Sequence, residues 1–321
     1  MGRYLLRRLG FALLLVFVVS SAALLLTQLA PGDIGSEQAF ADPAARERIR
    51  KELGLDRPLA VQYLSWLGGV VRFDFGRSML YSRPVSTLLS ERALNTAMLA
   101  TVALLLATAI GIPFGIYSGS RTRGLGRSIV RAVSVLGISV PPLIGSLLLV
   151  FLAARTGWFP VGGMTSSGGS EMSWGAWLAD LARHLPVPAL ALAIPLAASL
   201  ERLQSQAIAA ASQEPFVAAS RARGLERTQA LLRHAWPVSL RPVLGLYGVM
   251  IASLFSGSFL VEVVTSWPGL GRLMFEALRA RDLFLVAGCA ATGALFLALG
   301  TLIADLLLAY TDPRVGSGER A

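Results

Sequence analysis

The chain of 321 residues is too apolar for an ordinary soluble domain, because 54% of its residues are hydrophobic and its mean hydropathy is +0.62. Its formal charge of +10 comes from arginines spread along the sequence, which argues against a clustered nucleic-acid-binding face. Cys289 is the only cysteine, so an intrachain disulfide and a cysteine metal site are excluded. These features predict a membrane protein whose positive charge contacts anionic membrane lipid, with no nucleic acid as partner.

Apolar runs of the length needed to cross the hydrocarbon core, about 20 residues, occur six times. Helices satisfy the backbone hydrogen bonds in lipid, so the runs predict an all-α integral membrane protein with a single domain over residues 1–321. The prolines Pro113, Pro141 with Pro142, and Pro195 predict kinks in the second, third and fourth runs. The six expected transmembrane helices cover about 9–30, 94–119, 132–154, 184–207, 242–261 and 283–309.

The basic residues between the runs indicate the orientation, because short cytoplasmic loops retain Lys and Arg. Placing the N-terminus inside puts the arginine-rich loop 208–241 and both termini in the cytoplasm. The long external loop 31–93 exceeds the length of about 60 residues for which the charge rule holds. Four tryptophans beside span ends are expected to form an interfacial belt: Trp158, Trp174, Trp177 and Trp267.

Catalytic patterns are missing from the sequence. His184 and His234 fall on opposite sides of the predicted membrane, so they cannot form a metal pair. The serines of Ser256–Gly257–Ser258 have no base to activate them, and small residues in a span serve close helix packing. Lys51 is the only lysine and no phosphate-binding glycine loop precedes it. We therefore expect no catalytic residue, no cofactor and no metal, and no nucleotide hydrolysis by this chain.

The loop between the fourth and fifth runs is polar and rich in arginine. Gly224 divides it, because glycine can adopt the left-handed conformation that ends a helix. The first helix is expected at about 213–223, and the second at 226–236, where Pro237 would stop it. The second helix would align Leu225, Gln229, Leu232 and Trp236 on one face. Such a pair of amphipathic helices suits a groove in a partner protein or the surface of anionic lipid.

Six segments carry a resemblance to a known family. The loop sequence "AASRARGLERTQALLRHAWPVSLRPV" resembles the EAA motif of permease subunits in ATP-binding-cassette importers of the dipeptide, oligopeptide and nickel family. The segments "LTQLAPGD", "LGLDRPLAVQYLSWLGGVVRFDFGRS", "RPVSTLLSERALNTAMLA", "SWPGLGRLMFEALRARD" and "DPRV" are similar to the first permease subunit of that family. They occur in the family order along nearly the whole chain, which makes the resemblance specific.

The resemblance implies a permease in the bacterial cytoplasmic (inner) membrane that forms the translocation path with a homologous second permease. Its other implied partners are two cytoplasmic ABC ATPase subunits and an external solute-binding protein. The solute would be a peptide or a related small solute such as a nickel complex or an oligosaccharide. An ion-gradient-driven secondary transporter is the alternative. The residues that match the ATPase-coupling loop are Ala218, Ala219, Ser220, Arg221, Ala222, Arg223, Gly224 and Leu225.

Three residues at two places depart from the family pattern. Pro237 and Val238 stand where the family usually has Arg-Asn, which bears on the length of the second short helix. Gly300 stands where an asparagine is common before Asp305, so any role of Asp305 could differ in this chain.

Overall fold

The computed structural model describes residues 2–29, 57–70, 72, 74–121, 123–166 and 172–311. The chain forms two compact units. The first unit contains residues 98–267 and the segment that starts at Leu299, and the second contains residues 2–97 and 268–298. Helices dominate both units, and the described residues pair as β-structure only at an isolated bridge between Arg77 and Pro84.

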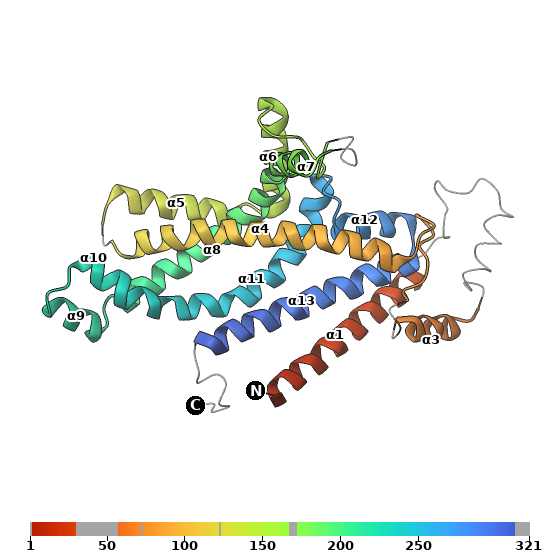
Figure 1. Cartoon of the computed structure of the whole chain (residues 1–321), viewed down its shortest axis with the longest axis horizontal. Helices are drawn as coiled ribbons and strands as arrows, with labels where there is room; N and C mark the ends of the chain where they lie inside the picture. Colours follow the sequence, from red (N-terminus) through yellow and green to blue (C-terminus); the bar gives the residue numbers. More distant parts are fainter. Residues whose placement is uncertain are drawn as a thin grey trace. The chain divides into compact units, whose positions relative to one another are not determined.

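Membrane-spanning length is reached by five helical stretches in the described part of the chain, or six if one bent helix pair is a single span. This confirms the predicted class, an all-α integral membrane protein. The long helices, drawn in Figure 1, are α1 (Gly2–Leu29), α4 (Val85–Gly119), α8 (Pro186–Ala211), α11 (Trp236–Val264) and α13 (Leu283–Thr311).

The third apolar run contains a sharper bend than the sequence suggested. It is divided into α5 (Leu125–Ser139) and α6 (Pro142–Thr156), whose axes differ by 105°. Val140 between them is extended, with φ −94° and ψ 109°, as a residue before proline prefers. Pro142 then begins α6 at a position where its missing N–H costs no hydrogen bond. The expected kink is therefore a break between two helices.

The expected external loop 31–93 contains more helix than its polarity suggests. The short helix α3 covers Leu59–Val70, and α4 begins at Val85 rather than near residue 94. Val85, Leu88 and Leu89 are buried in an apolar cluster with Leu273 of α12 (Leu270–Ala280), which explains the earlier start. Residues 30–56 lie outside the described part.

The core of the first unit forms where α4, α8 and α11 pack together. Three glycines on one face of α4 allow a close approach to α8. A Cβ atom at Gly111 would lie 2.6 Å from the carbonyl oxygen of Ala197, and one at Gly115 would lie 2.8 Å from that of Glu201. A Cβ atom at Gly119 would collide with the Ser205 carbonyl oxygen. The spacing of four residues places the three glycines on successive turns, so the two backbones are in contact along this stretch.

The expected tryptophan belt is wrong in one member. Trp158 and Trp174 are exposed and Trp177 is half-buried, whereas Trp267 is fully buried in the core of the first unit. Its backbone N–H donates a hydrogen bond to the Glu262 carbonyl, which folds the chain back after α11. A position beside a span end thus did not determine whether the indole faces lipid.

Candidate functional site

The α9 segment (residues 214–225) carries the site residues that the sequence suggested. Helix α9 covers Pro215–Ala222, within the expected 213–223. Glu214 is extended at its start and Pro215 occupies the first turn, where its fixed φ favours helix. Val217 and Ser220, three residues apart, are both buried. One face of α9 is therefore anchored to the protein.

The opposite face of α9 is open. Phe216 is 41% exposed. The other exposed residues of this face and its end are Ala218, Ala219, Arg221, Ala222 and Arg223. Small side chains beside an exposed ring and two guanidinium groups make a surface that a protein groove or an anionic lipid layer could contact.

The end of α9 is a glycine turn, as expected. Gly224 has φ +97°, a conformation that L side chains rarely adopt. Its N–H donates to the Arg221 carbonyl at 3.0 Å, and the Leu225 N–H donates to the Ser220 carbonyl at 3.3 Å. These two bonds are those of a Schellman motif, which satisfies the last carbonyls of a helix. The direction of the chain after α9 therefore depends on Gly224.

The second short helix differs from the expectation, because Pro237 does not stop it. Helix α10 covers Arg227–Ala230, the π-helix η2 covers Leu231–Ala235, and α11 follows directly from Trp236. The Trp236 N–H donates to the Leu231 carbonyl, five residues back. A wider turn relieves the clash that a proline ring makes with the carbonyl four residues earlier, so the chain continues helically through Pro237.

The face predicted for the second helix is also shifted. Gln229 and Leu232 are exposed, whereas the buried residues are Ala230, Leu231 and Ala235. The π-turn changes the angular spacing of the side chains, which a regular period of 3.6 residues does not anticipate.

The α9 segment is attached to the long helices through an apolar base. Val217 packs in one cluster with Ile208 and Ala211 of α8, together with the buried residues of α10 and η2. Ile116 of α4 packs against the same cluster. The Arg227 guanidinium also donates to the Ser120 carbonyl at 2.9 Å, just after α4 ends. Force applied to α9 would therefore reach α4, α8 and α11.

The other candidate residues have structural partners. Ser258 donates to the Phe255 carbonyl of its own helix at 3.1 Å, and Gly257 faces Leu192 and Pro142, as expected for helix packing. The His184 ring lies 2.8 Å from the Asp180 carbonyl of its own turn. No metal-binding group of His, Cys, Asp or Glu occurs among the described residues.

The departure at Gly300 has a steric reason. A Cβ atom there would collide with the Cγ2 atom of Ile251 on α11 and lie 3.2 Å from its Cβ. An asparagine does not fit this approach of α13 to α11. The Asp305 side chain lies outside the described part of the chain.

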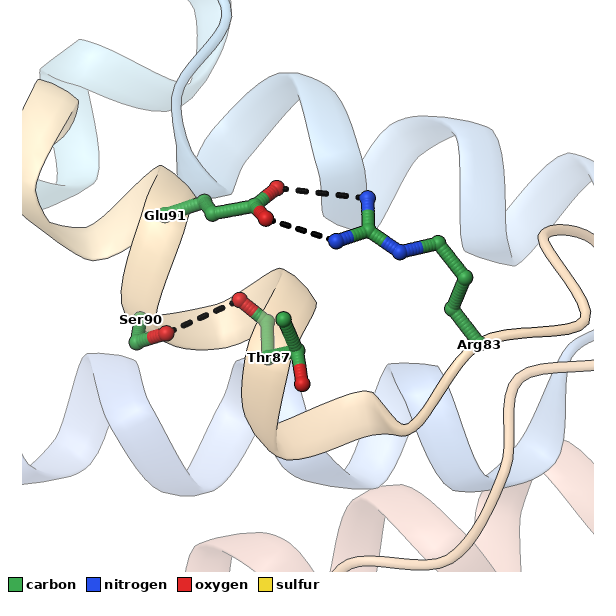
Figure 2. Close-up of polar contacts among 4 residues, drawn as sticks. All are labelled: Arg83, Thr87, Ser90 and Glu91. Atoms are coloured by element: carbon green, nitrogen blue, oxygen red, sulfur yellow. Dashed lines mark hydrogen bonds and ion pairs between the residues drawn. The ribbon is translucent and has the colours of Figure 1, made fainter.

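The charged residues before α4 are exposed: Arg72, Asp74, Arg77 and Arg83. Figure 2 shows how the Arg83 guanidinium meets the Glu91 carboxylate with both of its terminal nitrogens, at 2.6 and 3.4 Å. Ser90, one residue earlier on α4, donates to the Thr87 carbonyl at 2.9 Å. The contacts of Arg83 are therefore local to the start of α4.

The fold and the site together define a class: a multi-pass helical membrane protein that presents a small anchored helix outside its bundle. The sequence matches two family models that cover nearly all of it. One is described as the N-terminal part of a binding-protein-dependent transport system membrane component and matches residues 1–99. The other, the binding-protein-dependent transport system inner membrane component, matches residues 111–317. The chain belongs to this family of inner membrane transport components.

Similar proteins extend over the same length. The chain is 32% identical to the oligopeptide transport system permease protein AppB of Bacillus subtilis, with 98% of this chain and 99% of that protein covered. It is 33% identical to the dipeptide transport system permease protein DppB of Lactococcus lactis, with the same coverage. The fold resembles the methionine ABC transporter MetNI in an inward-facing conformation, with a TM-score of 0.51 at 18% identity over 73% of this chain and 97% of the other.

Proposed function

We propose that this inner membrane component is the permease of an ATP-driven importer whose solute is a peptide. The proposal for the solute rests on the names of relatives that match over the full length, since they are described as oligopeptide and dipeptide permeases. A homologous second permease would complete the translocation path, and an external binding protein would deliver the peptide. Nickel complexes and oligosaccharides remain related solutes to test in the same assay.

The α9 segment is proposed to dock on a separate cytoplasmic ATPase subunit. The observation that carries this step is the arrangement of α9, whose Val217 face is anchored while its Phe216 and Ala219 face is open. A rigid helix that is fixed on one side and ends in a defined turn can transmit movement from a partner to the spans. Residues 218–225 would supply the contact, with Arg221 and Arg223 at its rim. ATP would be hydrolysed by the partner alone.

A cross-linking experiment tests the docking. In a Cys289→Ser background, Ala219→Cys should cross-link to an ATPase subunit in the assembled complex, and the yield should change when ATP is bound. The matched control is Thr156→Cys, because Thr156 is also exposed but ends α6, which the proposed orientation places at the external side. Equal yields at the two positions would refute the docking.

The orientation is part of the proposal and is tested with the same background. Both termini and the α9 segment are placed in the cytoplasm, in agreement with the arginine distribution. An impermeant thiol reagent added to intact cells should label Ser82→Cys and leave Thr228→Cys unlabelled. Both positions are exposed in the structure, so access through the membrane decides the outcome. The reverse pattern would place α9 on the wrong side for an ATPase.

The alternative of a secondary transporter has no support in the family match. It is tested with vesicles that contain the permeases without ATPase subunits. Peptide uptake driven by an ion gradient in such vesicles would overturn the proposed energy source.

A further inference from the structure

The turn between α4 and α5 (residues 120–125) lies next to the α9 segment. The Arg227 guanidinium donates a hydrogen bond to the Ser120 carbonyl of this turn at 2.9 Å. Arg227 is the first residue of α10 and follows shortly after Gly224, where α9 ends. The Ser120 N–H donates to the carbonyl of Ile116, which packs against the apolar base of the α9 segment. The turn and the α9 segment are therefore neighbours at one end of the first unit.

The backbone of the α4–α5 turn is held from both of its helices. On the α4 side, the Arg121 guanidinium lies over the Tyr117 ring, 4.3 Å from its centroid, in a cation–π contact. On the α5 side, a Cβ atom at Gly126 would collide with the Tyr117 hydroxyl, so the tyrosine packs directly against the α5 backbone. The Ser128 N–H donates to the Gly124 carbonyl at 3.2 Å, which forms the first turn of α5. The conformation of the turn is thus fixed by contacts within the protein.

The fixed turn projects an apolar side chain. Leu125, the first residue of α5, is 79% exposed. Arg121 and Arg123, which precede it, are also exposed. An exposed leucine on a rigid backbone with guanidinium groups beside it is suited to a partner that offers an apolar pocket with a polar rim, the arrangement found at protein interfaces.

The charge of the turn has the same sign as that of the α9 segment. In residues 120–125 and 214–230, five arginines and two glutamates are exposed: Arg121, Arg123, Arg221, Arg223, Arg227, Glu214 and Glu226. One partner face that carries carboxylates around its apolar contacts would complement both surfaces.

We propose that the α4–α5 turn is a second contact with the ATPase subunit that receives the α9 segment, an inference that rests on the proposed function. Leu125 enters an apolar pocket of the ATPase, and Arg121 and Arg123 face carboxylates at its rim. Contact through α9 alone would leave the docked subunit free to rotate about one short helix, whereas a second contact fixes its orientation. The ATPase then acts on α4 and α5 directly as well as through α9.

An anionic lipid surface is the competing occupant of the turn. Lipid would accept the exposed arginines and the leucine. A lipid layer adapts to any shape, however, and gives no reason for a fixed backbone or for the bond between Ser120 and Arg227. The observations therefore favour a protein partner, and lipid is one outcome of the experiments below.

Cross-linking from two leucines of α5 tests the second contact. In the Cys289→Ser background of the assembled complex, Leu125→Cys with a photoreactive thiol label should cross-link to the ATPase subunit, and Leu136→Cys should not. Leu136 is the matched control, because it is 65% exposed on the same helix and lies about 16 Å further along it. Equal yields at the two positions overturn the proposal.

The Ala219→Cys variant separates this result from the docking of α9 itself. Cross-linking at Ala219→Cys without cross-linking at Leu125→Cys means that α9 docks alone, which refutes the second contact and leaves the docking intact. Failure at both positions refutes the docking and the second contact together.

A fluorophore on the same two cysteines detects lipid. In vesicles whose lipid tails are brominated, the fluorescence at Leu136→Cys should be quenched, whereas that at Leu125→Cys in the assembled complex should be spared. Equal quenching at the two positions would make lipid the occupant of the turn and overturn the proposal.

The affinity of the ATPase subunit measures the contribution of Leu125. Leu125→Ala should weaken ATPase binding to the permease complex roughly tenfold, the scale expected when a leucine buried in an interface loses its side chain. Leu136→Ala should leave the affinity unchanged. The amount of protein in the membrane should stay near normal in both variants, because both leucines are largely exposed. An unchanged affinity in Leu125→Ala refutes the second contact.

Discussion

The α9 segment and the loop before α4 (residues 74–84) differ in whether their polar side chains are hydrogen-bonded within the protein. In the loop, Asp282 accepts hydrogen bonds from the Ser78 hydroxyl and the Leu80 N–H, and Tyr81 bonds to Glu276. In the α9 segment, the guanidinium groups of the exposed Arg221 and Arg223 make no hydrogen bond or ion pair with the described residues. The polar groups of the loop are hydrogen-bonded within the protein and stabilise its conformation. The guanidinium groups of the α9 segment have no such partners and can contact another molecule. Substitutions in the α9 segment should therefore reduce transport, whereas substitutions in the loop should reduce stability.

The largest effect is expected in the α9 segment. Gly224→Val places a β-branched residue at φ +97°, which costs about 1 to 3 kcal/mol and turns the chain away from its present path. Peptide uptake and peptide-stimulated ATPase activity should be abolished while the amount of protein in the membrane stays near normal. Uptake by reconstituted vesicles and quantitative blotting measure the two quantities.

The matched control for this variant is Gly157→Val at the end of α6. Gly157 also has a positive φ of +67°, and a side chain there would also meet open space. The strain is similar but lies outside α9, so uptake per molecule should persist. If both variants lose uptake equally, backbone strain and not docking geometry explains the result.

The next effect concerns the loop before α4 and should appear in stability. Asp282 is fully buried and also accepts the Leu285 N–H at the start of α13, at 3.2 Å. Asp282→Ala leaves three donors without an acceptor and should reduce the free energy of unfolding by about 2 to 4 kcal/mol. Thermal unfolding in detergent should show a clear fall, with less protein in the membrane.

The stability of the Arg83→Ala variant is the comparison for that of Asp282→Ala. The Arg83→Ala change removes an ion pair whose two side chains are each 48% exposed, so the expected loss is only about 0.5 kcal/mol. A loss as large as that of Asp282→Ala would mean that the exposed pair, and not the buried carboxylate, holds the loop.

The smallest expected effect is a dependence of the protein's stability on pH in the alkaline range. Burial and the hydrogen bond to Glu276 raise the pKa of Tyr81 from 10.0 to about 12. The folded state holds this proton more tightly than the unfolded state, so the contribution is complete below pH 10.0 and is lost as pH rises toward about 12. Tyr81→Phe should therefore show a shallower loss of thermal stability in this range than the wild type. Identical pH profiles would show that Tyr81 contributes nothing there.

The apolar runs predicted the class of fold because lipid imposes one strong requirement on the backbone. They did not predict local departures from regular helix. The break at Val140 depends on how two successive prolines direct the chain, and the π-turn before Pro237 depends on relief of a clash inside the helix. Hydropathy averages over such events, so neither could be located from it.

The site was predictable where one residue determines the backbone. Gly224 was expected to end α9 and does so with the positive φ that glycine permits. The buried hydrogen bond from Ser118 to Glu201 was not predictable, because a charged residue near the end of an apolar run gives no sign of its partners. The spacing of Gly111, Gly115 and Gly119 was a usable signal for close helix packing, since small residues four apart form one stripe.

The glycine stripe of α4 also limits where a solute can pass. Its residues lie so close to α8 that the backbone carbonyls of Ala197, Glu201 and Ser205 would obstruct even a methyl group. A peptide is far wider than a methyl group, and parting these helices would break the buried hydrogen bond from the Ser118 hydroxyl of α4 to the Glu201 carboxylate of α8. The route of a solute through the membrane therefore does not run between these two faces of α4 and α8.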